Sequence, residues 1–390
     1  MDTKTYIESL GKKAKAAKLA SASLSENEKN AALEAIAAGL IADCENILAA
    51  NQKDIAAAKE NGTAEAMIDR LTLTKERIAG MAQGVRDVAK LPDPIGEVLE
   101  SVTRPNGLNI QKVRVPMGVI GIIFEARPNV TSDAAAICLK AGSAVILRGG
   151  KEAIHSNTAI IASMKKALAS KGLNEDLISF VEDTSRESSN ELIALREYID
   201  LLIPRGGAGL IANVVNNAKV PVIQTGTGNC HAYVHESADF EMALDIIFNA
   251  KTSRVSVCNA LESVVIDRSI APAFLPKMAE RLKEKNVTIV GDAESSAICS
   301  EILPASEADY YTEFLDYKLS VKILDGVAEA IDWVKIFDLL PSIYTIFFAV
   351  LQEKGSSRAR KCRNARAIRC KTVKFFYKFI TIYACILSFL

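Results

Sequence analysis

The chain has 390 residues, of which 49% are hydrophobic and 24% are charged, a balance typical of globular proteins. This length predicts two or three domains. Its 47 basic and 47 acidic side chains leave no formal net charge, so the overall charge indicates neither a nucleic-acid partner nor a strongly acidic one.

The charge is unevenly distributed along the chain. Residues 336–390 contain ten Lys or Arg, only two acids and ten of the 23 aromatic residues. Residues 1–335 keep the remaining 37 basic and 45 acidic side chains. Residues 336–390 (the tail) therefore differ in composition from residues 1–335 (the body).

The cysteines and the first residues bear on the cellular compartment. The eight cysteines include no Cys-x-x-Cys pair, and their spacing matches neither a disulfide framework nor a zinc site. Free thiols are expected in a reducing compartment, so we predict a cytoplasmic protein. The first residues lack the apolar core of a secretory signal, and no run of 18 apolar residues predicts a membrane span.

The first ninety residues are predicted to be helical. Ser25 and Glu28 form a capping-box pattern ahead of a stretch with apolar residues at helical spacing. Asn61 and Gly62 are expected to end the next helix.

A β-hairpin is predicted to follow these helices. Pro105-Asn106-Gly107 lies between β-forming residues, which is typical of a hairpin turn. We therefore expect an arm over residues 102–117. Such an arm needs a partner surface, because an isolated hairpin is only marginally stable in water.

From Val119 onward, apolar runs of four to six residues alternate with helical segments. This alternation indicates βαβ units and a parallel sheet, so the predicted fold class is α/β. The expected strands are VIGIIF, AVIL, ISFV, DLLI and VPVI. After Cys258, the runs VVID, VTIV and SVKIL suggest a second α/β unit.

Glycine-rich turns follow several expected strands. Ligands of open α/β sheets bind at the carboxyl ends of strands, and glycine lets the backbone approach a phosphate closely. No turn has the Gly-x-Gly-x-x-Gly spacing, so on spacing alone ordinary β-to-α turns are the better explanation, although the flanking Arg and Lys shift the balance somewhat towards a phosphate-bearing ligand. The turns are Arg148-Gly149-Gly150-Lys151, Arg205-Gly206-Gly207 and Thr225-Gly226-Thr227-Gly228.

One cysteine and two histidines are candidates for chemistry. Cys258 lies among polar residues in SRVSVCNALES and can act as a nucleophile if its thiolate is favoured. The alternative is a small buried hydrophobic residue, as we interpret Cys44 and Cys138. His231 and His235 share one face of a strand, but no third ligand has suitable spacing, so we expect no metal site.

Three long stretches of sequence together resemble a known family. They are RPNGLNIQKVRVPMGVIGIIFEARPNVTSDAAAICLKAGSAVILRGGKEA, DLLIPRGGAGLI and TGTGNCHAYVHESADFEMALDIIFNAKTSRVSVCNALES. In this order they resemble the γ-glutamyl phosphate reductases (glutamate-5-semialdehyde dehydrogenases) of the aldehyde dehydrogenase superfamily. The resemblance implies an aldehyde-dehydrogenase-like α/β fold. Its expected parts are a Rossmann-like nucleotide-binding domain at 1–101 and 118–255, an oligomerisation arm at 102–117 and a catalytic domain at 256–335.

The resemblance also implies an activity and roles for single residues. The activity is NADPH-dependent reduction of L-glutamyl 5-phosphate, the second step of proline biosynthesis, through a thioester on Cys258. Asn129, in ARPNVT, would help to form the oxyanion hole. The residues implied to bind NADPH or NADP⁺ are Arg148, Gly149, Gly150, Lys151, Arg205, Gly206, Gly207 and Glu313. Those implied to bind the substrate are Gly226, Thr227, Gly228 and Asn229.

Gln224 separates this reading from a hydrolytic enzyme. It stands before TGTG, where hydrolytic members of the superfamily carry a Glu that activates water. An amide cannot act as that base, so Gln224 favours phosphate as the acyl acceptor. The partners expected are the small substrate and further copies of the chain, with a functional link to glutamate 5-kinase, and neither nucleic acid nor membrane.

The resemblance ends near Trp333. Family members continue with HSDAIVT-like and glycine-rich segments, which are replaced here by the basic, aromatic residues 336–390. We therefore expect an incomplete catalytic domain, a tail produced by a shifted reading frame, low solubility, and impaired oligomerisation and activity. The alternatives are a tail that lies in a membrane surface, another CoA- or phosphate-dependent aldehyde dehydrogenase, and a non-catalytic remnant that binds nucleotide.

Overall fold

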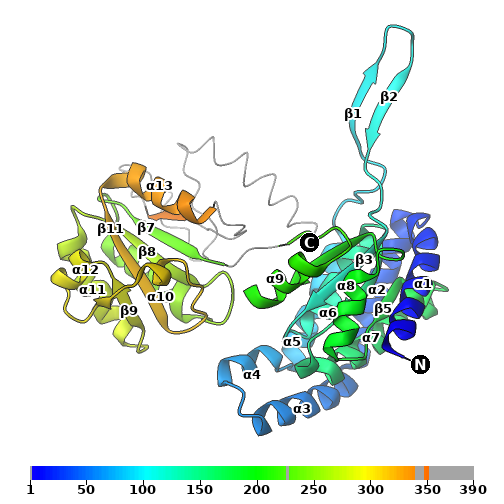
Figure 1. The fold of residues 1–390 in the computed structure, drawn as a ribbon, viewed down its shortest axis with the longest axis horizontal. Helices are drawn as coiled ribbons and strands as arrows, with labels where there is room; N and C mark the ends of the chain where they lie inside the picture. Colours follow the sequence, from blue (N-terminus) through cyan, green and yellow to red (C-terminus); the bar gives the residue numbers. More distant parts are fainter. Residues whose placement is uncertain (1, 225–227, 339–346, 351–390) are drawn as a thin grey trace. The chain divides into compact units, whose positions relative to one another are not determined.

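The computed structural model describes residues 2–224, 228–338 and 347–350. The described residues fall into two compact units, which separate after Gln224. Figure 1 labels their helices and strands. Within the described part of the chain, no helix combines the length and hydropathy that crossing a bilayer requires.

The first unit is a parallel sheet covered by helices, with a hairpin arm. The sheet order is β5-β4-β3-β6. The strands are β1 (Val98–Thr103), β2 (Asn109–Val113), β3 (Val119–Phe124), β4 (Ala144–Arg148), β5 (Ile178–Phe180) and β6 (Leu201–Arg205). The helices are α1 (Thr3–Ala22), α2 (Glu26–Ala42), α3 (Cys44–Glu60), α4 (Glu65–Leu71), α5 (Lys75–Ala89), α6 (Asn129–Lys140), α7 (Ile154–Ser170), α8 (Arg186–Ala194) and α9 (Ala208–Asn217), with the short 3₁₀ helices η1 (Lys151–Ala153) and η2 (Glu175–Leu177).

Both faces of this sheet are buried, which explains why its strands are continuously apolar. In β3, the side chains of Ile120 and Ile122 pack into a core that includes residues of α2, α5, α6 and α7. Val119 and Ile123 pack on the other face with residues of α1, α8 and α9. A parallel sheet covered on both faces is the expected result of the βαβ pattern.

The predicted helix signals are confirmed. Ser25 is the N-cap of α2 and forms the complete capping box with Glu28. Asn61 is the C-cap of α3, and Gly62 follows with φ +65°, a left-handed conformation that glycine adopts without strain.

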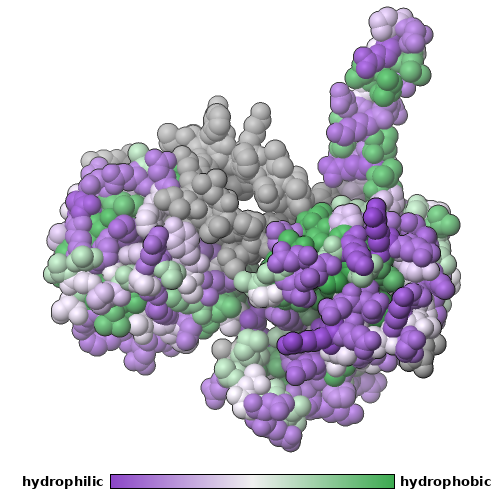
Figure 2. All heavy atoms as spheres, in the orientation of Figure 1, coloured by the Kyte–Doolittle hydropathy of each residue, from purple (hydrophilic) through white to green (hydrophobic). Residues whose placement is uncertain are grey.

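The predicted hairpin is confirmed and begins slightly earlier, at Val98. β1 and β2 pair antiparallel, with Val102 opposite Ile110. The Arg104 N–H donates to the Leu108 carbonyl at 2.8 Å. The hairpin projects from the first unit in Figure 1, and Figure 2 shows hydrophobic residues along it. All residues of both strands are exposed, so the hairpin carries apolar surface on both faces.

The second unit has its own parallel sheet. Among the described residues its order is β10-β9-β11-β8-β7-β12. The strands are β7 (Cys230–Val234), β8 (Leu261–Asp267), β9 (Thr288–Gly291), β10 (Leu303–Pro304), β11 (Lys318–Leu324) and β12 (Phe347–Val350). The helices are α10 (Phe240–Thr252), α11 (Ala271–Lys283), α12 (Ala293–Ile298) and α13 (Gly326–Asp338), with the 3₁₀ helix η3 (Glu307–Tyr310).

The second unit starts earlier in the sequence than the expected boundary after residue 255. β7 pairs in parallel with β8, and α10 packs in the same core as α11. Val264 and Ile266 of β8 face that core, whereas Val265 packs with Ala330 on the other face. The segment before Cys258 therefore belongs structurally with the segment after it. The functional roles given to the two parts remain a prediction.

The expected strand VPVI is wrong. Val222 makes only an isolated bridge to Leu202, in which the Leu202 N–H donates to the Pro221 carbonyl at 2.8 Å. Pro221 has no N–H to donate, so the ladder cannot continue through it.

Replacing Leu33 by Ala is expected to destabilise the first unit. Leu33 is fully buried in the main core, so the change should lower the free energy of unfolding by about 2–5 kcal/mol. Leu19→Ala is the matched control, because Leu19 is 74% exposed on α1 and should cost less than about 0.5 kcal/mol. Urea unfolding followed by circular dichroism measures both, and equal midpoints would contradict the assigned core.

Candidate active site

In the first unit, three strand ends place the predicted residues at one edge of the sheet. β3, β4 and β6 run parallel, with Phe124 opposite Arg205 and Ile123 opposite Arg148. The segments that follow these strands therefore start at the same edge, where ligands of open α/β sheets bind. The last residues of β4 and β6 and the segments after the three strands carry the predicted residues Asn129, Arg148, Gly149, Gly150, Lys151, Arg205, Gly206 and Gly207.

Arg148 has one donor without an acceptor in the part of the chain that the structure describes. Its Nη2 donates to the carbonyls of Thr184 and Ser185 at 3.0 and 3.2 Å. Its Nε is buried and has no hydrogen-bond partner among the described residues. Burial lowers the pKa of Arg148 from its ordinary value. A buried N–H without an acceptor is costly, so a ligand oxygen here would be stabilised, which fits a nucleotide cofactor.

Glu125 is a residue of this edge that the sequence analysis missed. Its Oε2 accepts the Gly207 N–H at 2.8 Å, at the start of α9. A Cβ on Gly206 would lie 2.6 Å from the same oxygen, so a larger residue there would displace the Glu125 carboxylate. The amino end of a helix favours negative charge, and Glu125 supplies it in this structure. Glu125 lies two residues before Arg127 in FEARPN, and neither the periodicity nor the residue spacing there predicted its role.

Asn129 is the first residue of α6, and its side chain is exposed. Its Nδ2 donates to Asp133 Oδ2 at 3.0 Å, one helical turn further on. Burial raises the pKa of Asp133. The amide that the resemblance assigns to the oxyanion hole is thus held by a residue of its own helix.

In the second unit, Cys258 lies close to Gly228 and Glu313. Cys258 is partly buried in the segment between α10 and β8. A Cβ on Gly228 would meet the Cys258 carbonyl oxygen, and it would lie 3.0 Å from both Cys258 Cβ and Glu313 Oε1. The Cys230 Sγ–H donates to the Cys258 carbonyl at 3.3 Å. The structure therefore brings three sequence-predicted residues together within this unit.

Asn229, which follows Gly228, is bonded to the segment before Glu313. It is 4% exposed, and its Nδ2 donates to the Tyr310 carbonyl at 2.7 Å. Tyr310 ends η3, three residues before Glu313. Of the other residues predicted to bind substrate, Gly226 and Thr227 lie outside the described residues.

A buried ion pair joins the two ends of the Cys258 segment. Lys251 Nζ lies 2.8 Å from Glu262 Oε2, and both side chains are almost fully buried. Burial raises the pKa of Glu262 to about 7, although Lys251 opposes that rise. Burial also lowers the pKa of Lys251. The sequence gives no signal of this pair, because neither residue stands in a recognisable motif.

His231 lies in β7 and His235 follows it. These two histidines do not form a metal centre in the described part of the chain. His231 is fully buried, and burial lowers its pKa to about 4. His235 Nδ1 lies 2.9 Å from Ser237 Oγ. Among the described residues, no group of three His, Cys, Asp or Glu side chains is placed to hold a metal ion.

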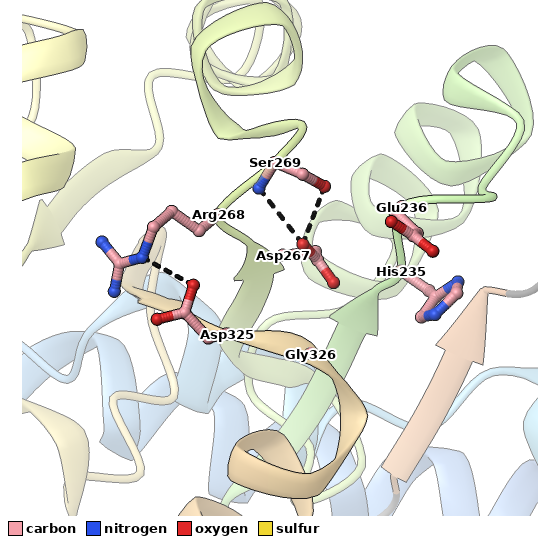
Figure 3. A pocket seen from close by; sticks show the side chains of 7 residues that line it. All are labelled: His235, Glu236, Asp267, Arg268, Ser269, Asp325 and Gly326. Carbon is pink, nitrogen blue, oxygen red and sulfur yellow. Dashed lines mark hydrogen bonds and ion pairs between the residues drawn. The ribbon is translucent and has the colours of Figure 1, made fainter.

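A hollow of about 420 Å³ lies at the opposite end of β8 from Cys258 (Figure 3). Asp267, the last residue of β8, accepts hydrogen bonds from Ser269 Oγ at 2.8 Å and from the Tyr233 hydroxyl at 3.1 Å. Arg268 Nε pairs with Asp325 Oδ1 at 2.8 Å. These charged groups have acceptors and donors within the protein, so we assign no ligand to the hollow.

Comparisons with known proteins identify the family of the chain. The aldehyde dehydrogenase family model matches residues 1–308. The γ-glutamyl phosphate reductase of Carboxydothermus hydrogenoformans is 55% identical over 322 residues, which cover 83% of this chain and 78% of that protein. The γ-glutamyl phosphate reductase of Heliobacterium modesticaldum is 53% identical over 325 residues, with the same coverage.

Solved structures show the same fold. The γ-glutamyl phosphate reductase of Thermotoga maritima has a TM-score of 0.81 at 40% identity and covers 89% of this chain and 83% of its own. An acetylating aldehyde dehydrogenase of Geobacillus thermoglucosidasius has a TM-score of 0.63 at 18% identity, covering 90% and 82%, and shares the fold. The chain therefore belongs to the γ-glutamyl phosphate reductases, oxidoreductases of the aldehyde dehydrogenase family.

Proposed function

We propose that the chain reduces L-glutamyl 5-phosphate to L-glutamate 5-semialdehyde with NADPH, releasing phosphate. The observation that carries the proposal is the grouping of Cys258, Gly228 and Glu313 in a chain 55% identical to a γ-glutamyl phosphate reductase. The product feeds proline biosynthesis. Because the described cysteines are all free thiols, we propose that the enzyme works in the cytoplasm.

Cys258 would act as the nucleophile. Its thiolate attacks the acyl carbon, the C–O bond to phosphate breaks, and a thioester forms. Bound NADPH supplies the hydride that reduces this thioester. The C–S bond then breaks, and the thiolate and the aldehyde are released. Both stages pass through a tetrahedral oxyanion, for which we propose the Asn129 amide and the Cys258 N–H as donors, each typically worth about 10²–10³ in rate.

The chain's own residues support the other roles. The unpartnered Nε of Arg148, together with exposed Lys151, offers charge to a cofactor phosphate, which favours NADPH over NADH. Arg205 ends β6, and Gly206 and Gly207 lead from it into α9 at the same edge of the sheet. We propose that these three residues also bind the cofactor, and that Glu313 holds its ribose. Gly228 and Asn229 are proposed to bind the substrate, as are Gly226 and Thr227. Gln224 cannot activate water, which leaves phosphate as the acyl partner.

Replacing Cys258 by Ser should abolish phosphate-dependent reduction of NADP⁺ by glutamate 5-semialdehyde. The measurement is absorbance at the NADPH band, with and without inorganic phosphate. Cys299→Ser is the control, because Cys299 is also partly exposed in the second unit but follows α12. Activity that survives in Cys258→Ser, or that needs CoA instead of phosphate, would contradict the proposed function.

Replacing Gly228 by Ala should displace the nucleophile. The added methyl group collides with the Cys258 backbone and with Glu313, and a shift of about 1 Å in reacting groups can cost roughly 10² in kcat. Gly80→Ala on α5 is the control, since its Cβ meets nothing within 4 Å. Steady-state kinetics compare the two, and equal kcat values would show that Gly228 does not set the position of Cys258.

The hairpin arm should mediate self-association. We propose a homo-oligomer in which the exposed apolar residues of β1 and β2 are covered by another copy, and which is weakened because residues 336–390 replace the family's C-terminal segments. We also propose a functional link to glutamate 5-kinase. The pair change Val102→Lys and Ile110→Lys should lower the mass in light scattering towards the 42.1 kDa of one chain. Ser101→Lys with Gln111→Lys adds the same charge to the neighbouring pair without removing apolar surface. Equal masses for the two variants would refute the role of the arm.

A further inference from the structure

The segment that carries Cys258 starts and ends at one buried contact. Lys251 lies in the last turn of α10, and Glu262 is the second residue of β8. Their side chains are 0% and 1% exposed, and Nζ lies 2.8 Å from Oε2. The backbone that leaves α10 and returns into β8 is therefore tied at its base, with Cys258 between the two fixed points.

Glu262 also holds a second segment. Its Oε1 accepts the backbone N–H of Leu315 at 3.2 Å, and its main-chain carbonyl accepts the Ser320 hydroxyl at 3.1 Å. Leu315 has φ +52°, a conformation that residues with side chains rarely adopt. Such a backbone persists only where surrounding contacts fix it. Leu315 lies two residues after Glu313, so this hydrogen bond sets the course of the Glu313 segment.

The two segments held by Glu262 meet at Gly228. The Cβ position of Gly228 lies 3.0 Å from Cys258 Cβ and 3.0 Å from Glu313 Oε1. The Glu262 carboxylate thus fixes both segments that lie next to Gly228. Its Oε2 binds Lys251 at the base of the Cys258 segment, and its Oε1 accepts the Leu315 N–H in the Glu313 segment.

Stability alone does not account for the pair. A buried ion pair contributes little more than two apolar side chains of similar size, because both charges lose their hydration. Two methionines would fill the same space. They would not accept the Leu315 N–H, which would lose its partner.

We propose that Glu262 is a positioning residue for the reaction of Cys258. It fixes the Cys258 segment through Lys251 and the Glu313 segment through Leu315. The distance between the nucleophile, Cys258, and the cofactor-binding carboxylate, Glu313, therefore stays constant. This inference rests on the proposed function of Cys258. Reacting groups must stay aligned within a fraction of an ångström, and a misplacement of about 1 Å can reduce the rate roughly 10²-fold.

Two double variants separate the positioning role from the burial of charge. Both replace Lys251 by Met, which avoids a lone buried ammonium. Glu262→Gln then keeps an oxygen that can accept the Leu315 N–H, whereas Glu262→Met removes it. The control pair is Lys29→Met with Asp93→Met in the first unit. Lys29 Nζ also lies 2.8 Å from Asp93 Oδ2, and Asp93 Oδ1 also accepts a backbone N–H, that of Ile95.

The first test is steady-state kinetics on protein that thermal unfolding shows to be folded. The Lys251→Met/Glu262→Met variant should lose about 10²-fold in kcat with KM changed less than about threefold, because geometry and not ground-state binding is disturbed. The Gln variant keeps the Leu315 link but lacks the Lys251 link, so its kcat should lie about tenfold below that of the wild type and about tenfold above that of the Met variant. The control pair should retain the kcat of the wild type. Equal kcat in the Met and Gln variants would overturn the proposal. If the Met variant does not fold, an unchanged kcat in the Gln variant overturns it, since the Lys251 link is lost there too.

Alkylation of Cys258 by iodoacetamide, followed by peptide mass spectrometry without cofactor, gives a readout independent of turnover. The rate at Cys258 should change at least about threefold in the Met variant, while Cys299 in the same protein keeps its rate. If the wild type shows no reductase activity, the proposed function fails and the alkylation still decides the positioning role. An unchanged rate at Cys258 in the folded Met variant overturns it.

Discussion

The parallel pairing of β3 with β4 and β6 is the constraint from which the candidate cofactor edge follows. Parallel strands deliver all their carboxyl ends to one edge, and the register places Arg148 opposite Ile123 and Arg205 opposite Phe124 there. Polar and glycine-rich segments follow each of these residues, and α6 and α9 begin among them. Burial of both faces by α1, α8 and α9 on one side and by α2, α5, α6 and α7 on the other makes this register rigid, since a slip by one residue would exchange the two cores.

The second unit uses its sheet differently. Cys258 precedes β8, so the candidate nucleophile lies at the amino end of its strand, and the hollow at Asp267 lies at the carboxyl end. The contacts around Cys258 are instead local. Cys230 and the Lys251–Glu262 pair provide side-chain contacts, and Gly228 lets its own backbone approach Cys258 closely. The two units thus reach ordered sites by separate means, one through sheet register and the other through buried polar contacts.

Sequence periodicity was sufficient for most of the fold, because strong local signals agree with the tertiary structure. The capping box at Ser25, the turn at Gly107 and the apolar runs from Val119 to Leu202 each formed the expected element. The expected strand VPVI did not form, because Pro221 interrupts the hydrogen-bond ladder between strands. The β-branched residues around Pro221 favour a strand, and composition alone does not show that the proline outweighs them. Cys258, Gly228 and Glu313 were named from family resemblance. Glu125 and Glu262 were not, because their significance comes from partners 82 and 53 residues away in sequence.

The strand order of the second unit has a consequence for how the chain is made. β11, the last of the strands before α13, lies between β8 and β9, which precede it in the sequence. During synthesis, β7 and β8 can pair with each other, and β9 can pair with β10, but the two halves have no common strand until residue 324 has left the ribosome. At about 5–20 residues per second, the first unit has several seconds to fold before that point. The segment that carries Cys258 is therefore produced early and acquires its neighbour Glu313 only when the middle of the sheet is inserted.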